Sequence, residues 1–407
     1  MSEAEKSAPG ERALRVLHVT PCYAPAWGYG GIVETVAHLT RHLARAGASV
    51  RVLTTDANGE HRRLTIAARE NYSREAGMQI VYCPRRAAHS IAPAMLARLP
   101  ALVRWADLVH LHAVYSFPTF PTLAYARMLG CPVVWTPHGA LQRWERSRRV
   151  ALKSPWEKIA AAIAPRRMTI HLTSDQEASE CANRFPSARR IIVSTGVEIP
   201  ERAMRSESAG KLRIGFIGRL DPKKGIENLL DACAMLAERA TPAFSLAIAG
   251  SGARDYERGI AARVAALAER AEVTMSSDVR GETKEKWFAS RDVVVVPSYT
   301  ENFANVVAEA LAREVPVIAS RGTPWAGLET HGCGLWVAND PASIASALER
   351  IAVMRLSEMG ARGRAFMIDS YSWERCARDM MRAYEEFLET REVAEAAADD
   401  HAHGAVR

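Results

Sequence analysis

The 407-residue chain lacks the features that mark membrane-spanning, secreted and zinc-binding proteins. No apolar run approaches the roughly 20 residues of a membrane-spanning helix. The polar start, Met1 to Arg12, has no apolar centre of the kind found in secretory signals. The seven cysteines are scattered and include no Cys-x-x-Cys pair, which argues against a zinc site or a disulfide framework. We therefore expect a cytoplasmic protein whose cysteines are reduced and mostly lie in the core.

The sequence also has no nucleic-acid recognition motif and no platform of alternating basic and aromatic residues. The net charge of +7 nevertheless favours a polyanionic partner. Nucleic acid is not expected. A nucleotide diphosphate, an anionic membrane surface or a lipid-diphosphate acceptor fits this charge better.

Strand and helix patterns alternate along the chain, which predicts parallel sheets covered by helices on both faces. The length predicts two domains rather than one core. In the first half, apolar strand candidates cover 14–20, 50–54, 79–83, 108–111, 133–136, 168–173 and 190–194. In the second half, they cover 212–217, 244–249, 273–275, 293–298 and 315–319.

We predict an α/β protein with two doubly wound, Rossmann-like domains at 13–200 and 211–371, joined by a charged linker at 200–210. A C-terminal helix at 372–391 follows, and the alanine-rich, polar segment 392–407 is expected to be disordered. In such folds, ligands bind at the carboxyl ends of the strands. The sequence therefore predicts a site in a central cleft between the two domains.

Glu301 and Glu309 bracket the most informative segment, which follows the predicted strand 293–298 and opens a helix. Unpaired amides at the helix start are suited to a diphosphate. Glu309 is placed to accept hydrogen bonds from ribose hydroxyls, and Glu301 from sugar hydroxyls. The predicted donor-binding residues in this segment are Glu301, Asn302, Phe303, Ala304, Asn305, Val306 and Glu309.

A second motif, Gly218-Arg219-Leu220-Asp221-Pro222-Lys223-Lys224-Gly225, lies where the strand 212–217 gives way to a helix. Arg219 can bind phosphate oxygens with two N–H groups, and Lys224 adds a point charge. Together they would neutralise the charge that develops on a departing nucleotide diphosphate. Each motif alone is also compatible with solvated surface residues. Their coincidence favours a nucleotide-sugar site.

These motifs resemble the retaining glycosyltransferases of family GT4, which have the GT-B fold and an E-x7-E signature. The similarity runs from Val16 to about Leu388. Further matching pieces are Gly28-Tyr29-Gly30-Gly31, Thr136-Pro137-His138-Gly139, Ala249-Gly250-Ser251-Gly252 and Ser372-Trp373. The stretches 21–28 and 320–325 resemble the branch found in bacterial surface-polysaccharide clusters.

The resemblance implies that Gly30 and Gly31 form a loop near the donor phosphates and that His138 lies near the reacting carbon of the sugar. It implies a catalytic set of His138, Glu301, Arg219 and Lys224. His112 is a secondary candidate at the end of the strand 108–111. The C-terminal helix is expected to cross back toward the N-terminal domain. Family members often have glycine where Asn302 and Ala304 stand, which leaves the donor's identity open.

The implied reaction moves a hexose-type sugar from a nucleotide diphosphate, GDP- or UDP-sugar, to a hydroxyl of a lipid-linked saccharide. No metal or other cofactor is expected, because the Asp-x-Asp triplet of the other common glycosyltransferase architecture is absent. Arg219, Lys224 and the helix start would supply the positive field instead.

The segment 143–167 combines eight basic residues with Trp144, Val150, Leu152, Trp156 and Ile159. Such a segment can lie on the inner face of the cytoplasmic membrane and receive a polyprenyl-diphosphate-linked acceptor. An ordinary helix with a solvated basic face and buried tryptophans explains the pattern equally well. Peripheral membrane contact is therefore one of two open interpretations.

Other functions remain open at this point. A glycoside hydrolase would also use two carboxylates, but they should lie within roughly 10 Å of each other, whereas eight helical steps span about 12 Å. A non-catalytic nucleotide-sugar-binding partner and a GT-B epimerase share the architecture. A dinucleotide oxidoreductase is less favoured, because Gly250-Ser251-Gly252 does not extend to a full glycine fingerprint.

Overall fold

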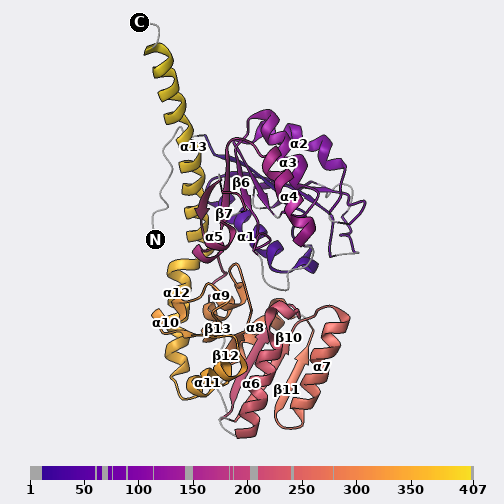
Figure 1. Ribbon diagram of the computed structural model, residues 1–407, viewed down its shortest axis with the longest axis vertical. Coiled ribbons are helices and arrows are strands. Elements are labelled where there is room, and N and C mark those ends of the chain that lie inside the picture. The colour runs from indigo at the N-terminus through magenta and orange to yellow at the C-terminus, as the bar shows by residue number, and fades with distance from the viewer. Residues whose placement is uncertain are drawn as a thin grey trace. The chain divides into compact units, whose positions relative to one another are not determined.

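The chain forms two compact units in a computed structural model. Unit 1 contains residues 1–173, 177–193 and 376–407, and unit 2 contains residues 174–176 and 194–375. The described residues are 12–404, apart from 60–61, 67–71, 76, 89, 113, 143–149, 183, 187, 202–209, 240–242 and 278. Figure 1 shows both units and labels many of their elements.

Unit 1 is built on an eight-stranded sheet with the order β3-β4-β2-β1-β5-β6-β7-β8. All neighbours pair in parallel except β3 and β4. The strands are β1 (Arg15–Val19), β2 (Ser49–Thr55), β3 (Tyr72–Glu75), β4 (Met78–Cys83), β5 (Leu108–His112), β6 (Val133–Thr136), β7 (Met168–Leu172) and β8 (Arg189–Ile192).

Helices cover both faces of this sheet. The helices α2, α3 and α4 pack on one face of the sheet, around a core that includes Leu17, Val109 and Trp135. The long helix α13 packs on the opposite face, where Tyr384 contacts His110. The helices are α1 (Gly31–Arg45), α2 (Ala94–Trp105), α3 (Thr119–Leu129), α4 (Val150–Ile163), α5 (Asp175–Cys181) and α13 (Trp373–Gly404), with the short 3₁₀ helix η1 (Trp27–Tyr29).

Unit 2 is built on a six-stranded parallel sheet with the order β11-β10-β9-β12-β13-β14. In sequence order this is 3-2-1-4-5-6, the order of dinucleotide-binding folds. The strands are β9 (Leu212–Ile217), β10 (Phe244–Ala249), β11 (Glu272–Ser276), β12 (Val293–Val296), β13 (Val317–Ser320) and β14 (Gly334–Val337).

The helices of unit 2 also lie on both faces of their sheet. One buried cluster joins the strands to α6, α7 and α11, and a second joins them to α8, α9, α10 and α12. The helices are α6 (Ile226–Arg239), α7 (Arg254–Ala268), α8 (Gly281–Ala289), α9 (Asn305–Ala312), α10 (Gly327–Thr330), α11 (Pro341–Ala352) and α12 (Leu356–Tyr371), with the 3₁₀ helix η2 (Pro222–Lys224).

The strands predicted from the sequence are present within a few residues, and the predicted doubly wound architecture is confirmed. All seven cysteines are buried, as predicted for core thiols. The first unit ends at Val193 rather than at residue 200, because residues such as Val197 pack in the core of unit 2. The segment 392–404, expected to be disordered, continues the helix α13 to Gly404, and most of the predicted linker, 202–209, lies outside the described residues.

Candidate functional site

In unit 2, the strand order reverses between β9 and β12, and the loops after these strands meet there. The backbone N–H of Tyr299 donates to the carbonyl of Lys223 at 2.9 Å. Gly225 has φ of 62°, and a Cβ atom there would lie 2.1 Å from the carbonyl oxygen of Pro297. Only glycine allows this approach. Ligands of open α/β sheets bind at such a reversal point.

Glu301 lies in the loop after β12 and is almost completely buried. Its carboxylate forms an ion pair with Lys224, and its Oε1 accepts a hydrogen bond of 2.8 Å from the hydroxyl of Ser298. Burial alone would raise the pKa of Glu301, but the positive charges of Lys224 and Lys223 and these hydrogen bonds lower it below its ordinary value. The carboxylate is therefore held in its charged form.

Two further cations lie near this ion pair: Lys223 acts on the charge of Glu301, and Arg219 acts on that of Lys223. Burial lowers the pKa of Lys223, and the neighbouring charges of Lys224 and Arg219 lower it further, whereas Glu301 acts in the opposite direction. The guanidinium of Arg219 is exposed. The structure thus brings the predicted residues Arg219, Lys224 and Glu301 to one edge of the sheet and adds Lys223, which the sequence analysis did not single out.

The second predicted glutamate, Glu309, lies in α9 and forms an ion pair of 2.8 Å with Lys284 of α8. The helix begins at Asn305, directly after Ala304, whose φ of 66° and ψ of 67° are left-handed. This conformation is unfavourable for a residue with a Cβ atom. Glycine would adopt this conformation without that cost.

The segment between the two glutamates is anchored to the core of unit 2. The carbonyl of Phe303 accepts a hydrogen bond from the indole N–H of Trp325, and their rings lie 5.2 Å apart. Phe303 is therefore a buried anchor rather than a surface contact. The other predicted residues of the segment, Asn302, Asn305 and Val306, are half-buried.

In unit 1, the predicted glycine loop follows β1, which lies beside β5 at the reversal of the strand order. Gly30 has φ of 72° and ψ of −147°, a conformation that is essentially restricted to glycine. Gly31 begins α1. The N–H of Gly28 donates to the side chain of Asn58 at 3.1 Å, and the hydroxyl of Tyr29 donates to the carbonyl of Gly59 at 2.9 Å. These contacts fix the loop.

His138, in the turn after β6, ends a chain of three imidazoles. His18 Nδ1 lies 2.9 Å from His112 Nε2, and His112 Nδ1 lies 3.0 Å from His138 Nε2. Burial lowers the pKa of both His18 and His138 to about 3. His138 also has a left-handed φ of 49°. The rings are therefore neutral at pH 7, and their hydrogen bonds orient His138.

A second chain on the same face of the sheet has a fixed direction. His171 Nε2 lies 2.8 Å from the carbonyl of Val193, which only accepts, so this nitrogen carries the proton. His171 Nδ1 must then accept from Thr136, 2.7 Å away, and Thr136 in turn accepts from His110 Nε2 at 2.5 Å. His110 Nδ1 accepts from the hydroxyl of Tyr384 at 2.5 Å.

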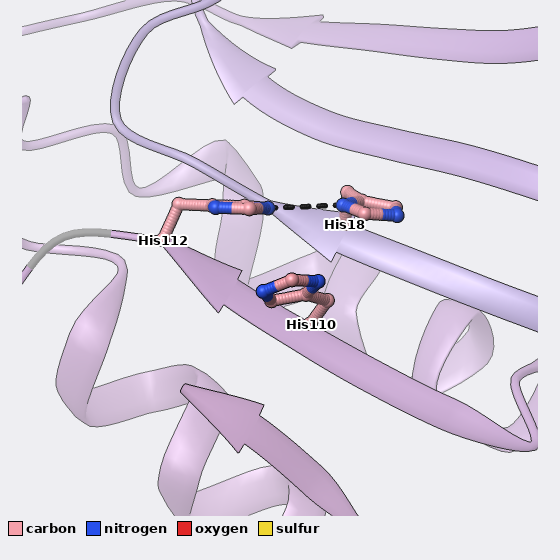
Figure 2. A group of neighbouring side chains, drawn as sticks. All are labelled: His18, His110 and His112. Atoms are coloured by element: carbon pink, nitrogen blue, oxygen red, sulfur yellow. Dashed lines mark hydrogen bonds between the residues drawn. The ribbon is translucent and has the colours of Figure 1, made fainter. Parts of the chain in front are cut away.

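His18, His110 and His112 have ring nitrogens within 4.8 Å of one another, as metal ligands would (Figure 2). However, both nitrogens of His110 and both of His112 already form hydrogen bonds. A metal ion would have to displace these partners. The His18 and His112 rings point toward each other (Figure 2), so the geometry favours a hydrogen-bond chain over a metal centre.

Glu177 of α5 is a residue that the sequence analysis missed. Its carboxylate is buried and accepts hydrogen bonds from the N–H of Gly139 at 2.9 Å and from the N–H and hydroxyl of Thr173 at 2.8 and 2.9 Å. It therefore links the turn that carries His138 to the end of β7. No sequence spacing predicts this role, because Glu177 and Gly139 are 38 residues apart.

The basic residues 143–149 of the segment 143–167 lie outside the described residues. Within α4, Trp156 packs on Phe120 with ring centres 4.1 Å apart and donates to the carbonyl of Val114. Leu152 and Ile159 are 70% and 52% exposed. The tryptophan thus packs against the core, while two apolar side chains of the helix face outward. None of the helices in the described part of the chain has the length and apolarity that a membrane crossing requires.

Comparison with known sequences identifies both units. Residues 29–200 match the family described as Glycosyltransferase Family 4, and residues 211–353 match the family described as Glycosyl transferases group 1. A D-inositol 3-phosphate glycosyltransferase of Arthrobacter sp. is 26% identical over 419 aligned positions, which cover 91% of this chain and 94% of that protein.

Solved structures share the fold. A sucrose-phosphate synthase from Thermosynechococcus elongatus superimposes with a TM-score of 0.71 and 20% identity, covering 93% of this chain and all of that one. Anabaena HepE in complex with UDP-glucose gives a TM-score of 0.68 and 16% identity over 92% of this chain and all of that one. The chain is therefore a glycosyltransferase of the GT4 type, with the GT-B fold.

Proposed function

We propose that the protein transfers a hexose-type sugar from a nucleotide diphosphate to a hydroxyl of a lipid-linked saccharide, with retention of the anomeric configuration, in bacterial polysaccharide biosynthesis. The observation that carries this proposal is a cluster at the strand-order reversal of unit 2, in which Lys224 and Lys223 act on the ionised carboxylate of Glu301 and Arg219 acts on Lys223. A diphosphate needs fixed cations, and a sugar needs a fixed acceptor of hydroxyl hydrogen bonds.

Each group has a distinct task in this proposal. Arg219 and Lys224 bind the diphosphate, and Glu301 accepts hydrogen bonds from hydroxyls of the donor sugar. The C–O bond between the sugar and the diphosphate breaks while the acceptor oxygen bonds to the same carbon from the same face. The acceptor's proton passes to a diphosphate oxygen. His138, neutral and oriented by His112, is the candidate contact for the sugar.

The donor is proposed to be a UDP- or GDP-sugar. The complex of the structural neighbour HepE with UDP-glucose supports the uridine form. We propose that no metal takes part, because the three cations and the start of α9 supply positive potential where the leaving group's charge develops. Transfer should then persist in excess EDTA, and loss of turnover in EDTA would contradict this part of the proposal.

The acceptor is proposed to be held at an anionic membrane surface. The exposed Leu152 and Ile159 lie seven residues apart on α4, so both face the same way, and the exposed Lys158 lies beside them. Co-sedimentation with vesicles containing about one-third anionic lipid tests the contact. Leu152→Ser/Ile159→Ser should reduce binding. Binding of the wild type at the level of neutral vesicles would rule the contact out.

The decisive experiment has two steps. A thermal-shift panel of UDP-, GDP-, ADP- and dTDP-sugars identifies the donor, since a true donor stabilises the folded protein. Transfer is then measured for Arg219→Ala and Glu309→Ala. Both should lose transfer. Arg219→Ala should keep a melting temperature near that of the wild type, because Arg219 is exposed. Glu309→Ala should melt somewhat lower, because it removes the ion-pair partner of the largely buried Lys284. Full activity of either variant, or no shift with any nucleotide sugar, would refute the proposal.

A further inference from the structure

Glu309, the predicted ribose-binding residue, forms an ion pair with a lysine. Its Oε1 accepts a hydrogen bond of 2.8 Å from Nζ of Lys284, and both side chains are largely buried, 15% and 20% exposed. The two residues come from different helices, α9 and α8. No motif in the sequence points to Lys284, so this pair is visible only in the structure.

A second ion pair fixes the helix that carries Lys284. The guanidinium of Arg313, just after α9, donates to both carboxylate oxygens of Glu285 at 2.6 and 2.7 Å and lies over the ring of Phe288 at 5.2 Å. Arg313 also donates to the carbonyl of Glu309 at 3.0 Å. Because α8 and α9 are joined in this way, Lys284 is held in place.

The pairing has two chemical consequences. A carboxylate has two oxygens and about four acceptor positions. With Lys284 on Oε1, the remaining positions are oriented and suited to a vicinal diol such as a ribose. The ammonium also offsets the negative charge of Glu309, which would otherwise repel the diphosphate of the same ligand.

We propose that Lys284 is a positioning residue for nucleotide binding: it orients Glu309 toward the ribose and cancels its charge. This inference rests on the proposed function. The opposite arrangement, in which Lys284 occupies the place of the ribose and must be displaced, predicts the opposite sign for the effect of its removal on affinity.

Calorimetric titration with UDP and with GDP, without acceptor, separates these cases. Lys284→Met should weaken binding of the preferred nucleotide about tenfold or more, because the charged hydrogen bond that orients Glu309 is lost. Lys284→Arg keeps the charge and should retain most of the affinity. Lys286→Met is the matched control, since Lys286 forms an exposed ion pair of 2.7 Å with Glu282 on the same helix. It should change affinity less than twofold.

The outcomes distinguish the inference from the proposed function. If the wild type binds UDP or GDP and Lys284→Met binds it equally or more tightly, the positioning role is wrong while the proposed function stands. An equal loss in Lys284→Met and Lys286→Met would also overturn it, because a general effect of charge would then suffice. If the wild type binds neither nucleotide, the proposed function fails and the inference fails with it.

Discussion

Lys224 and Glu301, 77 residues apart in sequence, form an ion pair in which the carboxylate is nearly buried and the ammonium is one-quarter exposed. One residue follows β9 and the other follows β12, so the pair closes the point at which the strand order reverses. The pair therefore links the fold to the site. Removing either partner has consequences for stability as well as for binding.

Lys224→Met should lower the free energy of unfolding by about 1–3 kcal/mol, because it leaves a buried carboxylate without its main counter-ion. Lys224→Met/Glu301→Gln should recover part of this loss, since the uncompensated charge is gone. Urea unfolding at pH 7 measures both. A double variant that is less stable than Lys224→Met would show that the charge is not the cause.

Glu301 should also contribute to acid sensitivity. Its pKa in the folded protein is lowered below the ordinary value of 4.5, so its contribution to stability is present above pH 4.5 and lost as the pH falls through the folded value. Glu301→Gln should therefore lose less stability between pH 5 and pH 3 than the wild type does. Parallel curves for the two proteins in urea unfolding over this range would contradict the assignment.

The buried histidines predict a second and larger pH effect. Burial lowers the pKa of His18 and His138 from 6.5 to about 3 and of His171 to about 4, and it lowers those of His110 and His112 well below 6.5. Unfolding below pH 6.5 therefore takes up protons. Each histidine should remove up to about 1.4 kcal/mol of stability per pH unit as the pH falls toward its folded pKa.

Urea unfolding at pH 7, 6 and 5 should show a steep loss of stability, and the NMR signals of these five buried histidines should not titrate between pH 8 and 5. Stability that stays flat from pH 7 to pH 5 would contradict the neutral histidine chains. A titration of the His138 ring near pH 6.5 would contradict its burial and would make a proton-accepting role for this ring possible.

The sequence predicted the architecture well because local signals suffice for it. Apolar runs such as 293–298 and 212–217 mark buried parallel strands, and the turn motifs after them lie at the sheet edge where ligands bind. For that reason the sequence placed Arg219, Lys224 and Glu301 at one edge of the sheet, where the structure has them. The family resemblance added His138 and Gly30, which the residue pattern alone does not single out.

Contacts between residues that are far apart in the sequence could not be predicted. Lys284 and Glu177 contact residues 25 and 38 positions away, and no local pattern in the sequence predicts which helices contact each other. The same holds for His110, whose partner Tyr384 is 274 residues away. The helix over 392–404 was missed because its composition resembles that of a disordered tail.

Tyr384→Phe tests the directed chain from α13 to Val193. The hydroxyl of Tyr384 is the donor for His110 Nδ1, and its loss leaves a buried acceptor without a partner. The free energy of unfolding should fall by about 1–2 kcal/mol. Phe387, on the same helix, cannot replace the lost donor even as tyrosine, because its ring stacks on Arg167. A Tyr384→Phe variant as stable as the wild type would mean that this hydrogen bond contributes nothing to folding.

Ala304 offers a stabilising substitution at the start of α9. Its φ of 66° costs a residue with a Cβ atom about 1–2 kcal/mol, whereas glycine adopts this conformation freely. Ala304→Gly relieves this strain. It also gives the unfolded chain more conformational entropy, which lowers the stability of the folded protein by about 0.5–1 kcal/mol. We expect a net gain of about 0.5 kcal/mol in urea unfolding. Ala304→Val, which is β-branched, should instead lose more than about 2 kcal/mol. A loss of stability in Ala304→Gly would mean that packing of the methyl group, and not backbone strain, determines the residue at this turn.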